Sequence, residues 1–149
     1  MLQGCQSIIE NPVISAFSLE IHIVWITKYR YKILREEVAI RTRDLIRRIC
    51  TEENAEILSG VVSQDHVHIL VSIDPSLSIS KLVQYLKGKT SRKLQQEYLH
   101  LKKRYWGQHL WARGYFAVST GNVSSKMVKE YIDHHFEEEE EGKDVFRIE

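Results

Sequence analysis

The sequence predicts an α+β protein with the element order βαββαβ, in which a ferredoxin-like or RRM-like sheet carries helices on one face and a C-terminal helix follows. Segments rich in β-branched and aromatic residues alternate with segments whose apolar residues repeat at helical spacing. A short polar turn, Gln64-Asp65, joins two strand segments as a hairpin. No repeat or linker interrupts the chain, so residues 1–149 are expected to form one domain.

The individual elements follow from these patterns. The predicted strands are residues 17–27, 57–63, 66–73 and 111–119. The predicted helices are residues 36–54, a segment from Ser78 or Ser80 to about Tyr98, and a last segment from about Asn122. The first strand is apolar at nearly every position, as expected of a central strand. Either serine can cap the second helix, and Gly88 is a point where that helix is expected to weaken or bend.

Charge is unevenly distributed along the chain. The formal net charge is +1, but residues 137–149 contain seven acidic and two basic residues. The remaining body therefore carries +6 and the acidic tail −5. A body of that sign attracts phosphates, whereas a glutamate run is typical of a solvated helix end or frayed tail.

Composition excludes several classes of protein. Cys5 and Cys50 are the only cysteines and lack a CxxC spacing, so we expect reduced thiols rather than a disulfide framework or a thiolate metal site. No stretch approaches the length of a membrane span, and the N-terminus lacks a signal-peptide pattern. A soluble cytoplasmic protein is expected, with enough hydrophobic residues (43%) for one core.

A histidine pair stands out on the third predicted strand. His66 and His68 are two residues apart, so both imidazoles leave one face of the sheet while Val67 and Ile69 leave the other. Two imidazoles on one strand form half of a divalent-metal site. The alternative is a pair of exposed or locally hydrogen-bonded histidines. His22, on the first strand, either approaches this site or is an ordinary buried histidine.

The last predicted helix offers two further polar side chains. Tyr131 and His135 are four residues apart and share one helical face. The simpler reading is a buried stripe, formed by Met127, Tyr131 and His135 or by Val128, Ile132 and Phe136.

Taken together, these motifs resemble the single-tyrosine HUH transposases of bacterial and archaeal insertion sequences. The matching segments are VWITKYR (24–30), DHVHILVSI (65–73), KLVQYLKGKTSRKL (81–94), LWARGYF (110–116) and VKEYIDHH (128–135). Their order along the chain is more specific than any single motif.

The resemblance implies that Tyr131 is a nucleophile and that His66 and His68 bind a divalent ion, Mg²⁺ or Mn²⁺. Family members usually carry glutamine four residues after the tyrosine as the third ligand, where this chain has His135. An imidazole there favours Mn²⁺ over Mg²⁺. His134 ranks second because it points about 100° away around the helix.

The same resemblance implies the reaction and the partners. Single-stranded DNA with hairpins near the element ends would be cut and rejoined through a 5′-phosphotyrosine. An obligate homodimer is also implied, in which the tyrosine helix of one subunit can complete the histidine site of the other. Sequence spacing does not decide between the two subunits.

Three clusters mix basic residues with aromatic residues, a combination that suits unpaired nucleic acid strands. The clusters are Lys28, Tyr29, Arg30, Tyr31 and Lys32; Lys87, Lys89, Arg92 and Lys93; and Lys102, Lys103, Arg104, Tyr105 and Trp106. An ordinary solvated surface is the alternative for each cluster.

Three other functions fit part of this pattern. A replication initiator or relaxase would share the histidines and the tyrosine but generally carries additional domains. An RRM-like RNA-binding module would need stacking aromatics on its central strands, where this chain has histidines. A metal-binding but inactive remnant is the third, motivated by His135.

Overall fold

The computed structural model describes residues 18–106, 108–119, 126–127 and 129–133. The elements in chain order are β1 (Leu19–Ile26), a short 3-10 turn η1 (Lys28–Arg30), α2 (Glu36–Glu52), β2 (Glu56–Val62), β3 (His66–Ile73), α3 (Ile79–Glu97), α4 (Leu99–Arg104) and β4 (Phe116–Ser119). Residues 126–127 and 129–133 are helical, and we call them the tyrosine segment. The predicted βαββαβ order is confirmed.

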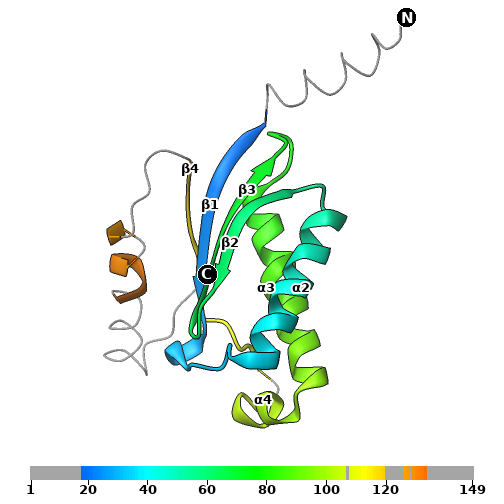
Figure 1. The fold of residues 1–149 in the computed structure, drawn as a ribbon, viewed down its shortest axis with the longest axis vertical. Coiled ribbons are helices and arrows are strands. Elements are labelled where there is room, and N and C mark those ends of the chain that lie inside the picture. Colours follow the sequence, from blue (N-terminus) through cyan, green and yellow to red (C-terminus); the bar gives the residue numbers. More distant parts are fainter. Residues whose placement is uncertain (1–17, 107, 120–125, 128, 134–149) are drawn as a thin grey trace, which may run out of the picture.

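The four strands form one antiparallel sheet in the order β2-β3-β1-β4 (Figure 1). Strands β1 and β3 are central, and their register pairs Val24 with His68 and Trp25 with Val67. The β2–β3 ladder contains an irregularity between Ile57 and Ser59. This strand order is that of the split βαβ unit predicted for a ferredoxin-like sheet.

Helices α2 and α3 cover one face of the sheet (Figure 1). The core on this face contains alternate residues of the central strands, such as Trp25, Val67 and Val71, which are fully buried. Leu82 and Leu86 from α3 pack into it. Burial of this apolar surface is the main favourable contribution to folding.

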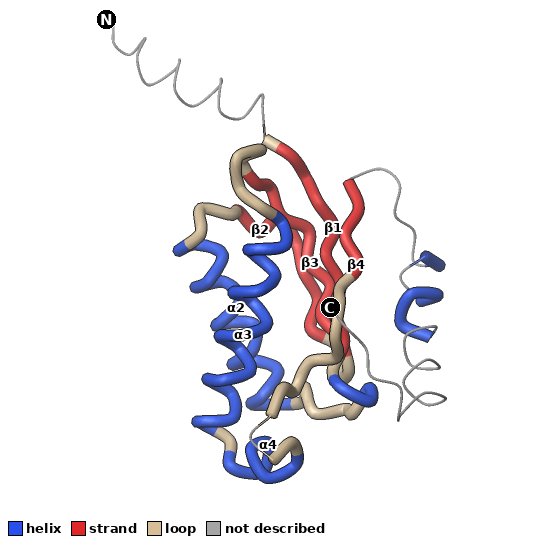
Figure 2. The backbone as a smooth tube through the Cα atoms, turned by 180° about the vertical axis from the view of Figure 1, so that it is seen from behind, coloured by secondary structure: helices blue, strands red, loops and turns tan. Residues whose placement is uncertain are grey.

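A smaller apolar cluster lies on the opposite face, built from Val24, Ile26, Ala112 and Ile132. The tyrosine segment is on this side of the sheet, away from α2 and α3 (Figure 2). The helices of the βαβ units therefore lie on one face, as predicted, and the tyrosine segment covers part of the other.

One strand boundary and one helix differ from the prediction. The fourth strand begins at Phe116 rather than at Trp111, which makes only an isolated bridge to Thr27. The indole of Trp111 is instead buried, where it donates to Thr90 and contacts Trp25. Helix α4 was not predicted.

The helix α3 has the predicted start and extent. The hydroxyl of Ser78 accepts a hydrogen bond from the backbone N–H of Lys81, so Ser78 is the cap. The helix continues through Gly88 to Glu97 without a break. In the part of the chain that the structure describes, no helix is long and apolar enough to cross a membrane.

Candidate active site

His66 and His68 lie on β3 with both side chains on the face opposite α2 and α3, as the strand alternation predicts. Both side chains are half-buried. Across the sheet they face Ile26 and Val24 on β1. The histidine pair therefore lies next to the small apolar cluster on which the tyrosine segment packs.

The ring of His66 is held by its neighbour in the chain. Nδ1 of His66 lies 2.8 Å from Oδ1 of Asp65. An ionised carboxylate only accepts hydrogen bonds, so this contact places the proton on Nδ1 and leaves the Nε2 lone pair available to a cation. Burial favours a higher pKa for Asp65, but hydrogen bonds from His66 and Arg30 and the charge of Arg30 together lower that pKa below its ordinary value.

His68 has a different neighbour. Its Nε2 lies 3.1 Å from Nδ1 of His22 on β1, and the two rings are tilted by 52°. Burial, followed by the nearby His22 and His66, lowers the pKa of His68 and favours its neutral form. A neutral imidazole is the form that binds metals. His22 thus approaches the site, one of the two outcomes that the sequence left open.

Tyr131 packs on the same sheet face as the histidines. Its ring lies 5.4 Å from that of Phe116, and Phe116 pairs with Val24, which in turn pairs with His68. The backbone of Phe116, on which the tyrosine packs, is therefore about two strand spacings, roughly 10 Å, from that of His68. Its hydroxyl oxygen has almost no accessible surface. Ile132 is the most buried described residue of the segment, as expected of an apolar stripe.

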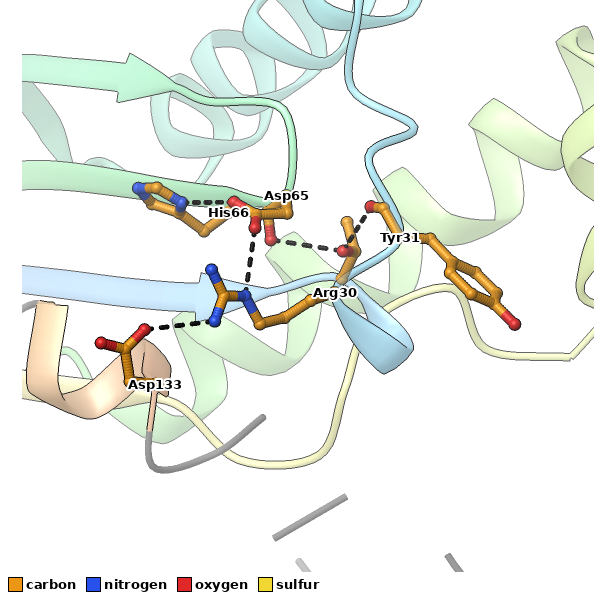
Figure 3. Close-up of polar contacts among 6 residues, drawn as sticks. Arg30, Tyr31, Asp65, His66 and Asp133 are labelled. Atoms are coloured by element: carbon orange, nitrogen blue, oxygen red, sulfur yellow. Dashed lines mark hydrogen bonds and ion pairs between the residues drawn. The ribbon is translucent and has the colours of Figure 1, made fainter. Parts of the chain in front are cut away.

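Arg30 connects the two halves of this face (Figure 3). Its Nε is 3.1 Å from Oδ2 of Asp65, and its Nη1 is 3.2 Å from Oδ1 of Asp133 in the tyrosine segment. The sequence suggested a DNA contact for Arg30 and gave no sign of these two carboxylate partners.

Residues 15–135 match the family described as "Transposase IS200 like". The chain belongs to the IS200-like transposase family. The match spans the histidine pair, the tyrosine and the residue four positions after it, so the resemblance seen in the motifs is confirmed.

Relatives in this family cover most of the chain. The ISDra2 transposase TnpA of Deinococcus radiodurans is 32% identical over 123 residues, which are 83% of this chain and 88% of that protein. The transposase for insertion sequence element IS200 of Salmonella typhimurium is 34% identical over 124 residues, covering 83% and 81% of the two chains.

Solved structures agree with the fold. A crystal structure described as that of a transposase from Deinococcus radiodurans superimposes with a TM-score of 0.75 at 33% identity, covering 80% of this chain and 92% of that one. A REP-associated tyrosine transposase bound to a REP hairpin gives a TM-score of 0.51 at 13% identity, covering 83% and 68%. This second likeness concerns the fold alone.

The two candidates for the third metal ligand, His135 and His134, lie outside the described residues. Within the described part of the chain, no group of three or more His, Cys, Asp and Glu side chains is arranged to hold a metal ion. The third ligand therefore stays a prediction.

The basic and aromatic clusters have varied surroundings. The guanidinium of Arg104 lies 4.0 Å from the centre of the Tyr31 ring, and Tyr31 also contacts Tyr29 and Tyr105. Trp106 follows this group with 86% of its surface exposed. An exposed indole beside cations is a suitable stacking partner for a nucleobase.

Two of the four basic residues on α3 that were predicted to contact DNA make contacts within the protein. Nζ of Lys87 donates to the carbonyl oxygens of Ala112, at 2.8 Å, and Gly114, at 3.0 Å. Lys89 lies 3.6 Å from a carboxylate oxygen of Glu52. Arg92 and Lys93 are exposed on the same helix. DNA contact by Lys28, Tyr29, Arg30, Lys87, Lys89, Arg92 and Lys93 stays a prediction.

Proposed function

We propose that the chain cleaves and rejoins single-stranded DNA at the ends of an insertion sequence through a covalent bond between Tyr131 and a 5′-phosphate. The observation that carries the proposal is the shared sheet face. Tyr131 packs on Phe116, in the cross-strand row that continues through Val24 to His68. Membership of the IS200-like transposase family supports the same conclusion.

In the proposed reaction, each phosphoester bond that breaks is replaced by another phosphoester bond. The phenolic oxygen of Tyr131 forms a bond to phosphorus while the bond from phosphorus to the 3′-oxygen breaks, and the phenolic proton ends on that oxygen. A second 3′-hydroxyl then attacks the phosphotyrosine, the bond to tyrosine breaks, and the phenol is restored. No water or ATP is consumed.

The tyrosine needs help to lose its proton, because an ordinary phenol has a pKa of about 10. We propose that His66, His68 and His135 would hold a divalent ion. The hydrogen bond from His66 to Asp65 supports this assignment, because it leaves one nitrogen lone pair free and fixes the ring. When bound, such an ion supplies positive charge to the non-bridging phosphate oxygens. Three imidazoles favour Mn²⁺ over Mg²⁺.

The family resemblance implies both the DNA and the assembly. A neighbour of the same fold is bound to a REP hairpin, which supports hairpin DNA as the substrate class. We also propose a homodimer, which sedimentation would test. Whether Tyr131 acts in its own subunit or in the partner subunit is addressed by mixing two inactive variants, His66→Ala and Tyr131→Phe. Recovery of activity in the mixture indicates action between subunits.

The deciding experiment is capture of the covalent intermediate. Labelled single-stranded DNA carrying a hairpin is incubated with the protein and Mn²⁺, denatured, and examined for a DNA-protein adduct that maps to Tyr131. Tyr131→Phe is expected to reduce the adduct by roughly three orders of magnitude or more while DNA binding persists. Tyr85→Phe, a tyrosine packed on the α2–α3 side, is the matched control.

Two results would count against the proposal. A Tyr131→Phe protein that still forms the adduct requires another nucleophile. His66→Ala and His68→Ala proteins whose adduct formation responds to Mn²⁺ like the wild type would remove the histidines from the metal site.

A further inference from the structure

One guanidinium joins the strand that carries the histidines to the segment that carries the tyrosine (Figure 3). Arg30 contacts Asp65, which precedes His66, and Asp133, which is two residues after Tyr131. The side chains of Arg30, Asp65 and Asp133 are 27%, 12% and 48% exposed. Asp65 and Asp133 are separated from Arg30 by 35 and 103 positions in the sequence.

The contact with Asp65 continues to the histidine. One oxygen of the Asp65 carboxylate accepts from Nε of Arg30, and the other from Nδ1 of His66 at 2.8 Å. A continuous chain of hydrogen bonds thus runs from Asp133 through Arg30 and Asp65 to His66. Each link is charge-assisted on at least one side, which makes it stronger and more directional than a bond between neutral groups.

The backbone around Arg30 is arranged for this contact. Tyr29 and Arg30 have positive φ values of 61° and 53°, a conformation that costs free energy in any residue other than glycine. The turn is tied to the Asp65 turn because the N–H of Thr27 donates to the carbonyl of Asp65 at 2.9 Å. The Thr27 hydroxyl donates to the carbonyl of Tyr31 at 2.7 Å. Strained backbone of this kind persists where surrounding contacts hold it, often at functional sites.

We propose that Arg30 is a positioning residue that holds the tyrosine segment against the histidine strand of its own subunit, and that this register aligns Tyr131 with His66 when the two act within one subunit. The inference rests on the proposed function. The role requires arginine, because the planar guanidinium presents two donor groups at a fixed angle to the two carboxylates. The ammonium of a lysine is a single compact group and cannot donate to both carboxylates in this geometry. A guanidinium between two carboxylates is also poorly suited to binding a DNA phosphate.

The first test separates positioning from DNA binding. The rate of adduct formation at saturating DNA and Mn²⁺, and the DNA affinity, are measured for Arg30→Gln, Arg30→Lys, Asp133→Asn and the double variant Arg30→Gln with Asp133→Asn. Glu97→Gln is the matched control. It removes a similarly exposed pair, in which Arg41 makes two 2.8 Å bonds to Glu97 between α2 and α3.

We expect Arg30→Gln and Asp133→Asn each to slow adduct formation about two- to fivefold, the size of effect typical of partly exposed ion pairs, with DNA affinity unchanged. The double variant is expected to be no slower than Arg30→Gln, because the Asp133 contact is already lost. Arg30→Lys is expected to behave like Arg30→Gln, and Glu97→Gln like the wild type.

The second test does not depend on catalysis. Hydrogen exchange of the amides at residues 126–133 is expected to rise about two- to fivefold in Arg30→Gln and Asp133→Asn, and to stay unchanged in Glu97→Gln. This result stands even if Tyr131→Phe still forms the adduct, so failure of the proposed function is distinguishable from failure of the inference.

Two outcomes overturn the inference. The first is unchanged exchange and adduct rate in Asp133→Asn. The second is a loss of DNA affinity in Arg30→Gln that Arg30→Lys restores, which would make Arg30 a DNA contact.

Discussion

The hydrogen bond between Trp111 and Thr90 gives a stability prediction whose size can be worked from the structure. Nε1 of Trp111 donates to Oγ1 of Thr90 at 2.8 Å, and both residues are buried. The Thr90 hydroxyl itself donates to the carbonyl of Leu86 at 2.6 Å. The indole also contacts Trp25 edge to face, with ring centres 5.9 Å apart. This contact fixes the chain next to Ala112, on which the tyrosine segment packs.

Replacing either partner removes the bond in a different way. Thr90→Val keeps the shape of the side chain but leaves the indole N–H buried without an acceptor, at a cost of about 1–3 kcal/mol. Trp111→Phe removes the donor, part of the buried ring and part of the contact with Trp25, at a cost of roughly 2–4 kcal/mol. In the Trp111→Phe background no buried donor is left behind, so adding Thr90→Val is expected to cost only about 0–0.5 kcal/mol.

The assay is a double-mutant cycle from urea unfolding followed by circular dichroism, which does not depend on the altered tryptophan. The expected coupling, the difference between these two costs, is about 0.5–3 kcal/mol, and each kcal/mol corresponds to about 2–4 °C in Tm for a chain of this size. If Thr90→Val costs the same in both backgrounds to within about 0.5 kcal/mol, the bond does not stabilise the fold and the reasoning is refuted.

The remaining predictions concern lysines and a thiol. Lys87→Met is expected to lower the free energy of unfolding by about 1–3 kcal/mol, because it loses two bonds to carbonyl oxygens. Lys93→Gln is expected to leave stability unchanged and to reduce the salt dependence of DNA affinity by about one unit of slope. If Lys87→Met lowered this slope and Lys93→Gln lowered stability, Lys87 would be the DNA contact and Lys93 the structural residue. Burial raises the pKa of Cys50 to about 11. In a Cys5→Ser background, no thiol should therefore react rapidly with a disulfide reagent at pH 8 until the protein unfolds, and a fast-reacting native thiol would contradict this burial.

Local patterns predicted most of the fold because most elements have a single strong period. Helix α2 buries Val38, Leu45, Ile46 and Ile49, the residues that its spacing placed on one face. The fourth strand was predicted too long because propensity ignores tertiary contacts, and Trp111 makes buried side-chain contacts with Thr90 and Trp25 and only an isolated bridge to Thr27. Helix α4 has one buried residue, Leu101, and so shows no period that could be recognised.

The site was predictable only where it follows from alternation along a strand. The two-residue spacing of His66 and His68 places both side chains on one face whatever else the chain does. The contacts of Arg30 depend on a left-handed turn and on carboxylates far away in the sequence, and no local pattern encodes them. His22 could be placed near the histidines only once the register of β1 and β3 was known.

The sequence of β1 reflects burial on both faces of the sheet. An antiparallel sheet with helices on one face and water on the other is expected to alternate apolar and polar residues. Instead, Ile23, Val24, Trp25 and Ile26 are all buried. Ile23 and Trp25 belong to the core under α2 and α3, whereas Val24 and Ile26 pack with Ile132 of the tyrosine segment. The unbroken apolar run that predicted a central strand thus also reflects a cover on its second face. Polar substitution of Val24, which pairs with both His68 and Phe116, is therefore expected to disturb the site more than the core.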